Sequence, residues 1–358
     1  MRFAIAIPTD ADSWRVVRRA EELGFHRAWF YDTQMLSADP FVAMAAAAMK
    51  TTQIRLATGV LIPSNRLAAV AANAFASLNK LAPGRIDFGI GTGFTGRRAM
   101  GLGAVRLADM EEYIRVAQAL LRDETVEATI EGKKRLIRLL NPELGLINTR
   151  DPIPLFIAAT GPKARALTAK LCAGWINTAA DVDGGVAGLR EMERLWAATG
   201  HDKAALQSVV LTGGAVLEEG EPADSPRAIA QAGPRAAMLL HRAADAALMG
   251  MPTMHPNAIA PALSETIAAY VEKARHFTPQ GAQYLENHRG HLMFVKPEER
   301  PYITADLIRT TTITATEPVI KQRLAALADA GYQEVAVQIV PGQEHAIEDW
   351  GRIRRAFV

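Results

Sequence analysis

A run of glycines and threonines is the strongest chemical signal in this sequence. Residues 91–96, with the sequence GTGFTG, directly follow the apolar segment 86–90. Because glycine lacks a Cβ atom, such a run can adopt positive φ angles and bring its backbone close to a ligand. The run also matches G-x-G-x-x-G, the dinucleotide fingerprint. Gly91 and Gly93 are therefore candidate ligand-binding residues.

Histidines near the C-terminal end of the chain are the candidates for proton transfer. His255, His288 and His291 lie in one long segment, and histidine is the usual proton shuttle near neutral pH. His288 and His291 have a spacing that metal ligands can share, but no third acidic or cysteine ligand lies nearby in the sequence. We therefore predict that the chain holds no metal, and we favour an acid–base role for His291.

A repeating alternation of strands and helices has to position these residues. Mostly continuous apolar segments are typical of parallel strands that are buried on both faces. They occur at 3–8, 25–31, 54–60, 86–90, 154–159, 175–178, 208–216 and 334–340. Helical patterns alternate with them, most clearly at residues 65–80. Eight such units in one chain predict an α/β fold, a (β/α)8 TIM barrel.

Two segments interrupt the alternation. Residues 125–140, centred on Glu131-Gly132-Lys133, predict a β-hairpin. Residues 218–309 form a long insertion between the seventh and eighth strands, with helical patterns at 226–249 and 261–277. We expect residues 1–358 to form a single domain, and the insertion to cover the mouth of the barrel.

The barrel changes the meaning of the glycine run. A dinucleotide fingerprint opens the first βα unit, whereas three predicted units precede this run. The residues after Gly96 are also poor helix formers, and the next credible helix begins near Ala108. In a barrel, glycines after a strand lie at the mouth, where ligands bind. An ordinary tight turn is the alternative interpretation.

The composition excludes several classes of protein. The 358 residues carry a net charge of +2 without a dense basic run, which argues against nucleic acid as a partner. One cysteine, Cys172, rules out a disulfide framework and a cysteine-based metal cluster. No uncharged apolar segment reaches about 18 residues, and early charges interrupt any signal-peptide pattern. We predict a cytoplasmic protein without membrane association.

The order and spacing of several segments resemble the luciferase-like flavin oxidoreductases. This superfamily includes bacterial luciferase, FMN-dependent two-component monooxygenases, and enzymes of the deazaflavin coenzyme F420 such as methylenetetrahydromethanopterin reductase. The resemblance covers nearly the whole chain. Its segments are AEELGF (20–25), YDTQ (31–34), IRLATGV (54–60), GRIDFGIGTG (84–93), PLFIAATGPK (154–163) and HRGH (288–291).

The resemblance implies that a flavin binds at the mouth of the barrel. The third strand resembles one that ends in a non-proline cis peptide behind the flavin ring, here Gly59-Val60. The turn after the fifth strand and the end of the sixth would hold the cofactor phosphate, and Pro162 suits the first turn of a phosphate-binding helix. The implied cofactor-binding residues are Thr58, Gly59, Val60, Gly91, Gly93, Thr160, Gly161, Thr178 and Ala179.

The resemblance also points to catalytic residues. Many relatives have an acid–histidine pair after the second strand, but this chain has Asp32-Thr33-Gln34. The usual histidine is missing, so Asp32 keeps an implied role in orienting substrate or cofactor. The alternative is that Asp32 is an acid near the start of the next helix. His291, between Gly290 and Leu292, is our candidate to replace the missing histidine.

The implied function is a flavin-dependent oxidoreductase. We expect a monooxygenase that uses reduced FMN and O2 on a small organic substrate, with a separate flavin reductase, because no NAD(P)H site is evident. FMN is preferred because the acid–histidine pair of many deazaflavin enzymes is absent. The first alternative is hydride transfer with coenzyme F420, whose polyglutamate tail would follow Arg97, Arg98 and Arg106; a solvated basic loop is the equal alternative for these three arginines. The second is a barrel that binds flavin without catalysis.

Two further expectations concern assembly and a competing fold class. Members of the resembled family commonly dimerise through the second and third helices, and the alanine-rich segment 43–48 is compatible with a homodimer. A metal-dependent hydrolase barrel would show H-x-H near the end of the first strand. Pro8-Thr9-Asp10 stands there instead, so this class is disfavoured.

Overall fold

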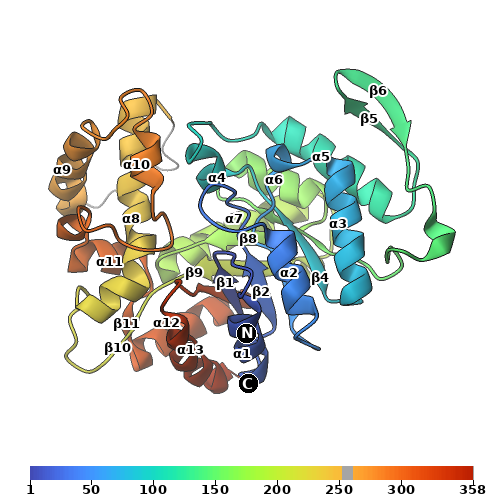
Figure 1. Ribbon diagram of the computed structural model, residues 1–358. Helices are drawn as coiled ribbons and strands as arrows, with labels where there is room; N and C mark the ends of the chain where they lie inside the picture. Colours follow the sequence, from blue (N-terminus) through green and yellow to red (C-terminus); the bar gives the residue numbers. More distant parts are fainter. Residues whose placement is uncertain (252–260, 358) are drawn as a thin grey trace.

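A closed barrel of eight parallel strands forms the centre of the computed structural model, which describes residues 1–251 and 261–357 (Figure 1). The strand order is β1-β12-β9-β8-β7-β4-β3-β2. The closed sheet confirms the (β/α)8 barrel and excludes an open Rossmann sheet. The strands are β1 (Arg2–Ile7), β2 (Arg27–Phe30), β3 (Arg55–Thr58), β4 (Ile86–Ile90), β7 (Leu155–Ala158), β8 (Gly174–Thr178), β9 (Ser208–Thr212) and β12 (Glu334–Gln338).

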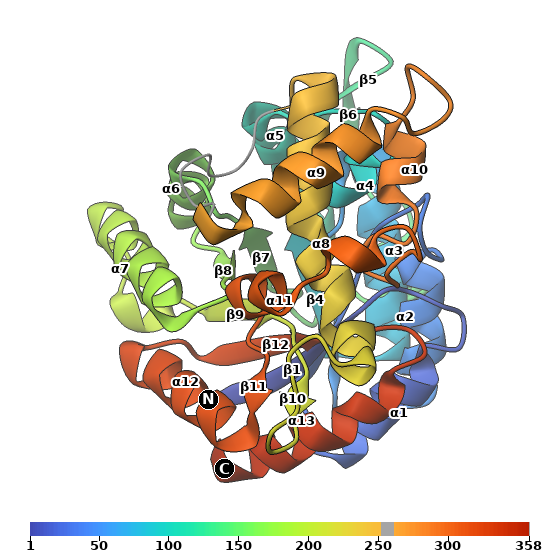
Figure 2. The ribbon, with the colours of Figure 1, turned by 90° about the vertical axis from the view of Figure 1, so that its left-hand side faces the viewer.

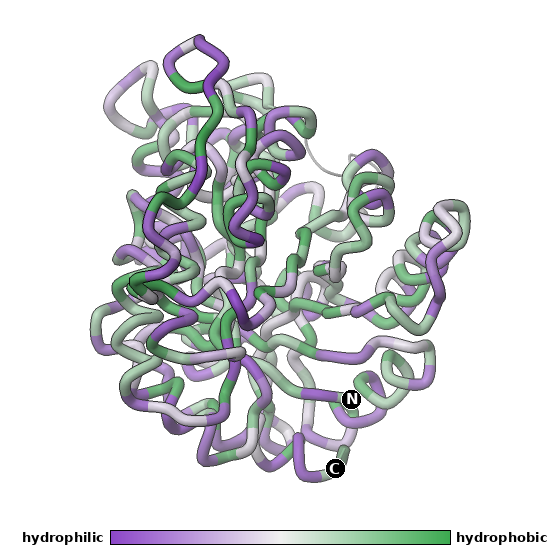
Figure 3. The backbone as a smooth tube through the Cα atoms, turned by 90° about the vertical axis from the view of Figure 1, so that its right-hand side faces the viewer, coloured by the Kyte–Doolittle hydropathy of each residue, from purple (hydrophilic) through white to green (hydrophobic). Residues whose placement is uncertain are grey.

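Helices cover the outside of the barrel. Along them the chain alternates between hydrophilic and hydrophobic residues (Figure 3), as expected for helices with one buried face. Within the described part of the chain, each helix is too short or too polar to cross a membrane. These outer helices are α1 (Trp14–Glu22), α2 (Pro40–Ala48), α3 (Ala68–Leu81), α5 (Leu107–Leu121), α6 (Pro162–Lys170), α7 (Val182–Ala198), α12 (Glu317–Ala330) and α13 (Ile347–Arg354).

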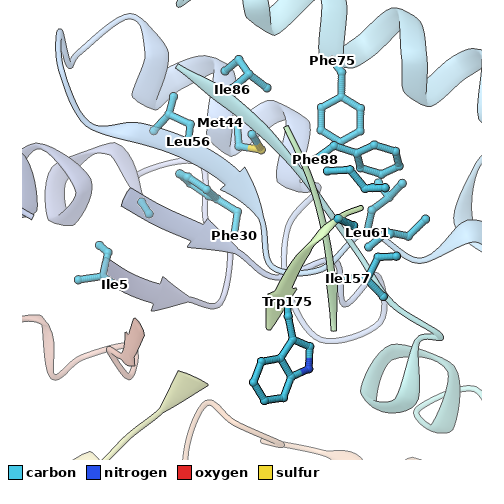
Figure 4. Packing of buried hydrophobic residues seen from close by; sticks show 14 of the residues in the cluster. Ile5, Phe30, Met44, Leu56, Leu61, Phe75, Ile86, Phe88, Ile157 and Trp175 are labelled. Carbon is cyan, nitrogen blue, oxygen red and sulfur yellow. The ribbon is translucent and has the colours of Figure 1, made fainter. Parts of the chain in front are cut away.

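The main hydrophobic core lies between the strands and this helical layer. Phe75 of α3 packs on Phe88 of β4, with ring centroids 4.7 Å apart, and both side chains are fully buried. Figure 4 shows Met44 of α2 in the same layer. Burying side chains of this size contributes about 1.5–3 kcal/mol each. The barrel is therefore held rigidly from outside, and the ends of its strands are fixed in space.

A buried ion-pair network closes the N-terminal end of the barrel. Arg27, the first residue of β2, contacts Asp87 at 2.9 Å and Glu334 at 2.8 Å. Asp87 also pairs with Arg55 at 2.7 Å, and the Trp29 indole donates to Glu334 at 3.1 Å. Each buried carboxylate thus has a cationic partner, which offsets the cost of desolvating it. This network occupies the end of the barrel opposite the predicted site.

The segment predicted as one strand at 208–216 is divided in the structure. Strand β9 ends at Thr212, and β10 (Val216–Leu217) pairs in parallel with β11 (Ala315–Thr316) in a separate two-stranded sheet. Gly213 and Gly214 interrupt the strand at a crowded position. A Cβ on Gly213 would lie 2.8 Å from Cδ of Arg235, and one on Gly214 would lie 2.8 Å from the amide nitrogen of Thr314.

The predicted hairpin is present as β5 (Val126–Ile130) and β6 (Lys133–Ile137), which pair antiparallel. Its two-residue turn has positive φ angles at both Glu131 and Gly132, which are 51° and 74°. Positive φ at both positions is typical of the tight turns that match strand twist. Figure 1 shows the hairpin projecting from the edge of the barrel.

The insertion contains most of the remaining helices, which pack on one another through a second hydrophobic cluster that includes Leu240, Tyr270 and Leu307. Figures 1 and 2 show them as a group beside the barrel, with α8 and α9 side by side. The predicted pattern at 261–277 yields a helix that ends at Ala274, and His255 lies outside the described residues. The helices are α8 (Pro226–Met249), α9 (Ser264–Ala274), α10 (Tyr284–His288) and α11 (Ala305–Thr311).

Candidate active site

A cavity of about 200 Å³ opens where the barrel strands end. Its wall combines segments that follow the strands with one face of α8, so it lies between the barrel and the insertion. Because all eight strands are parallel, their C-terminal ends meet at this face, where (β/α)8 enzymes bind their ligands. Val60, Ile176, Leu211 and Leu292 give the wall an apolar character.

The glycine run lines the cavity, but it differs from expectation in forming a short helix. Helix α4 (Phe94–Arg98) begins directly after Gly93, whose φ angle is 78°. A Cβ on Gly91 would lie 2.7 Å from Val60 Cγ2, and one on Gly93 would lie 2.6 Å from Ile62 Cγ2. The glycines therefore let the segment after β4 pack directly against the segment after β3. The helix was missed because these contacts, rather than helix propensity, stabilise it.

The Gly59–Val60 peptide bond is cis, as the resemblance implied, and both residues line the cavity. A Cβ on Gly59 would lie 2.7 Å from the Trp29 Cβ, so the backbone passes close to β2. Thr58 is fully buried and does not line the cavity. Its hydroxyl donates to the Gly89 carbonyl at 2.7 Å and accepts from the Gly89 amide at 3.1 Å. Thr58 thus joins β3 to β4 beneath the cavity.

The residues predicted to hold a phosphate separate into two groups. Thr160 and Thr178 line the cavity. Gly161 is the N-cap of α6, where no side chain caps the helix and a Cβ would meet no atom within 4 Å. Amides at such a helix start suit a phosphate, so these three residues fit the implied group. Ala179 lines a different, smaller pocket, and the structure does not bring it to the cavity.

Asp32 lines the cavity, but both oxygens of its carboxylate are occupied. One accepts from the Ile62 amide at 2.9 Å and from Arg66 Nη1 at 2.9 Å, and the other accepts from Arg66 Nη2 at 3.3 Å. The buried charge is therefore balanced by a guanidinium. In this arrangement Asp32 fixes the loop after β3, which carries Ile62 against the glycine run.

His291 lies behind the cavity wall, next to Leu292, which lines it. Its Nε2 is 3.5 Å from the Thr95 hydroxyl, and Thr95 does line the cavity. Its Nδ1 is 2.6 Å from Nδ1 of His241. Burial holds the pKa of His291 well below its ordinary value, and neighbouring cationic groups and histidines act in the same direction. His291 is therefore a neutral imidazole one residue removed from the cavity.

The carboxylate of Glu299 fixes the proton positions of His241 and His291 in this histidine cluster. His241 Nε2 lies 2.7 Å from Glu299, which also contacts Lys296 at 2.8 Å. Burial opposes ionisation, but His241 and Lys296 hold the pKa of Glu299 down at about 2. An ionised carboxylate only accepts, so His241 carries its proton on Nε2 and its Nδ1 accepts from His291. The Nε2 of His291 is then free to accept from Thr95.

The same cluster offers a set of metal-ligating atoms. Nitrogen atoms of His241, His288 and His291 lie within 4.8 Å of one another. The sequence did not reveal this set because His241 comes from α8, far from the other two along the chain. However, the 2.6 Å between His241 and His291 is shorter than the roughly 3.3 Å between tetrahedral ligands bound at about 2.0 Å. The spacing fits a hydrogen bond, and the absence of a bound metal stays a prediction.

Three arginines were predicted to form a basic groove for a polyglutamate tail, and for Arg98 this prediction is wrong. Arg98 is buried and pairs with Asp245 at 2.8 Å, an interaction with the insertion that the sequence could not show. Arg97 donates to Ser64 at 2.7 Å, and Arg106 is exposed beside Asp109.

Several cavity residues were missed by sequence reasoning. Tyr31 ends the predicted second strand, and burial raises its pKa to about 12. Arg235, Met238 and Arg242 of α8 also line the cavity. A signal was available, because these three residues share one face of the predicted helix at 226–249. The sequence alone did not say which way that face points.

The chain is similar in sequence to known F420-dependent enzymes over part of its length. The chain is 38% identical over 142 residues to F420-dependent glucose-6-phosphate dehydrogenase of Beutenbergia cavernae, covering 38% of this chain and 40% of that protein. It is 30% identical over 238 residues to F420-dependent hydroxymycolic acid dehydrogenase of Mycobacterium tuberculosis, covering 58% of this chain and 65% of that protein. In both cases the match spans less than two thirds of the relative.

Solved structures share the fold over nearly the full length. The F420-dependent tetrahydromethanopterin reductase of Methanopyrus kandleri superposes with a TM-score of 0.70 at 19% identity, covering 98% of this chain and 97% of that one. The monooxygenase RslO1 of Streptomyces bottropensis gives 0.63 at 16% identity, covering 99% and 98%. The family model described as luciferase-like monooxygenase matches residues 8–334. This chain therefore belongs to the luciferase-like family and is an oxidoreductase.

Proposed function

We propose that this protein transfers a hydride between coenzyme F420, bound in the cavity, and a small organic substrate. The observation that carries the proposal is the similarity to F420-dependent dehydrogenases at 38% and 30% identity. This favours the deazaflavin alternative over the FMN monooxygenase that we preferred from the sequence. The argument for FMN was the missing histidine after Asp32, and Thr95 together with His291 offers another proton path in its place.

The lining of the cavity supports this proposal. The bare backbone of Gly91, Gly93 and the Gly59–Val60 segment would lie against the cofactor ring, and the start of α6 would hold the phosphate. When bound, the deazaflavin supplies a carbon that gives or takes a hydride. Apolar side chains from β8 and β9 would keep water from that carbon.

The hydrogen-bond chain behind the wall would serve the proton that accompanies hydride transfer. Oxidising an alcohol to a ketone releases a hydride from carbon and a proton from oxygen. The Thr95 hydroxyl is at the cavity and can take that proton while it passes its own to His291 Nε2. His291 can then donate through Nδ1 to His241, which Glu299 holds in place. In the reverse direction the same chain would deliver a proton to a carbonyl oxygen.

Equilibrium binding of each cofactor tests the proposal. The protein, stripped of any bound cofactor, is titrated with F420 and with FMN while absorbance and intrinsic fluorescence are followed. We expect saturable binding of F420 and at least tenfold weaker binding of FMN. Tight FMN binding without F420 binding would reverse the choice and restore the two-component monooxygenase with its separate reductase. Binding of F420 without turnover of any alcohol or ketone would favour a non-catalytic binding protein.

We also propose that the protein forms a homodimer through α2 and α3. These helices pack side by side, and large apolar residues on and beside them are exposed, by 60% for Val42, 67% for Met49 and 54% for Val70. Clustered exposed apolar residues mark association surfaces. Sedimentation equilibrium should give a dimer for the natural sequence and a monomer for Val70→Glu. A monomeric natural protein at micromolar concentration would rule the dimer out.

A further inference from the structure

Two arginines of α8 line the cavity from the side of the insertion. Arg235 and Arg242 are seven residues apart, which is about two helical turns, so both side chains leave the same face of the helix. Arg235 is only 6% exposed. Gly213 leaves space for this side chain, because a Cβ atom at that position would lie only 2.8 Å from the Arg235 Cδ.

Neither guanidinium is satisfied by the described part of the protein. Arg235 donates from Nη2 to the Leu211 carbonyl at 3.1 Å, but its Nε is buried and has no acceptor. The Nε of Arg242 is likewise buried without an acceptor, and its guanidinium lies 4.8 Å from the centre of the Phe94 ring. A guanidinium has five N–H donors, so both arginines keep donors for a ligand.

The positive charge of this wall is not balanced by a carboxylate. Asp32 is the one carboxylate among the described residues that line the cavity, and it pairs with Arg66. Asp245, which is buried nearby, pairs with Arg98. The segment 252–260, outside the described residues, has neither Asp nor Glu in its sequence. Burial lowers the pKa of Arg242 to about 10, so it still carries its charge at neutral pH.

Arg235 is buried and Arg242 is half-buried. Cations removed from water without an ion-pair partner are costly to a folded protein, unless a ligand brings the missing negative charge. A carboxylate or phosphate matches the planar donor pattern of a guanidinium and binds it with charge-assisted hydrogen bonds. We propose that Arg235 and Arg242 form an anion subsite that binds a carboxylate or phosphate group of the substrate. Assigning that anion to the substrate rests on the proposed function, whereas the subsite itself does not.

The location of the pair favours the substrate over the cofactor phosphate. The proposed phosphate site uses Thr160 and Gly161 after β7, on the barrel side of the cavity. Arg242 instead approaches Phe94 after β4, and both arginines belong to the helix on the other side. A substrate held by this wall would have its anionic group toward α8 and its reacting carbon toward the barrel.

Inorganic phosphate is the first probe of the subsite. Titration calorimetry and thermal denaturation of the cofactor-free protein should show saturable phosphate binding and a raised Tm. Arg235→Met and Arg242→Met should each weaken phosphate binding at least tenfold, and Arg→Lys at either position should weaken it less. Arg227→Met is the matched control, because Arg227 is on the same helix but pairs with Glu221 away from the cavity. It should bind phosphate as the natural protein does.

The Met variants should fold, because each removes a charge that is wholly or partly buried and lacks an ion-pair partner. Their Tm without ligand should be equal to or higher than that of the natural protein. A clear loss of Tm without ligand would show that the arginines are structural and would overturn the proposal. So would phosphate binding that is undetectable in the natural protein or unchanged in both Met variants.

Coenzyme F420 distinguishes the source of the anion. If the subsite serves the substrate, both Met variants should bind F420 within about twofold of the natural protein, and the F420-loaded protein should still bind phosphate. If F420 blocks phosphate and both variants bind F420 tenfold more weakly, the anion belongs to the cofactor and the substrate assignment is wrong. If phosphate binds through the arginines but F420 does not bind at all, the proposed function fails and the anion subsite stands.

Discussion

The Nδ1 atoms of His291 and His241 lie 2.6 Å apart, and this contact connects the wall of the cavity to the buried carboxylate of Glu299. His241 belongs to α8, whereas His291 lies in the turn that follows α10, so both come from the insertion. Thr95, from the barrel, contacts the other nitrogen of His291 at 3.5 Å. The insertion therefore reaches the barrel both through this chain of polar contacts and through the charged face of α8.

The first prediction concerns this path. His291→Asn should lower kcat for an alcohol substrate by about a hundredfold, the lower end of what a positioned acid or base contributes, with KM little changed. His288→Asn is the control, because His288 belongs to the same cluster but bonds Asp245 rather than Thr95. Steady-state kinetics compare the two variants. An equal loss in both would show that the cluster acts only through packing.

The second prediction is that the protein loses stability as the pH falls below 6.5. Burial lowers the folded-state pKa of His241 and of His291. Below the pKa that histidine has in the unfolded chain, the unfolded chain binds protons that the folded chain does not. Each of the two histidines therefore lowers the free energy of unfolding by up to about 1.4 kcal/mol for each pH unit. Above pH 7 both histidines are neutral in either state, and this loss of stability is absent. Urea unfolding between pH 7 and 5 should show the decline, and a shallower slope is expected for His291→Asn.

The third prediction is that the histidine cluster works without a metal. Arg242 and Lys296 act on the cluster as positive charges and oppose a further divalent cation. Treatment with EDTA, followed by buffer exchange, should therefore leave Tm and turnover unchanged. Elemental analysis showing one equivalent of zinc or iron per chain, lost together with stability on chelation, would assign the three histidines to a metal instead.

The fourth prediction addresses the closed end of the barrel. Arg27→Met leaves Asp87 with Arg55 alone and leaves Glu334 buried without its cation. Breaking such a buried pair costs about 3–5 kcal/mol in the free energy of unfolding. Arg19→Met removes exposed surface pairs with Glu348 and Glu22 and should leave the free energy of unfolding almost unchanged. Urea denaturation measures both, and similar values for the two variants would contradict the structural reading.

The fifth prediction tests the glycine run. Gly91→Ala places a Cβ 2.7 Å from Val60 Cγ2, so Val60 has to shift within the cavity. We expect at least tenfold weaker cofactor binding with a modest loss of stability. Gly103→Ala is the matched control, since its Cβ would meet no atom within 4 Å. Fluorescence titration with F420 compares the variants, and equal affinities would mean that Val60 does not contact the cofactor.

The sequence by itself determined the architecture. Apolar segments at 3–8 and 334–340, the Glu131-Gly132 turn and the helical pattern at 226–249 are local signals, and local periodicity and turn chemistry decide local structure. The resemblance also placed the cis peptide at Gly59–Val60. Local pattern gave the wrong secondary structure at Gly213–Gly214 and at α4, because contacts with distant residues determine the backbone conformation there.

Only the tertiary structure decided what the site residues contact. Asp32 pairs with Arg66, His291 contacts His241, and Arg98 pairs with Asp245 in the insertion. These partners are far apart in sequence, and no periodicity records which way a side chain points across the cavity. The charged face of α8 has the same origin. Helix periodicity determines which residues share that face, but the packing of the insertion on the barrel turns Arg235 and Arg242 toward the cavity.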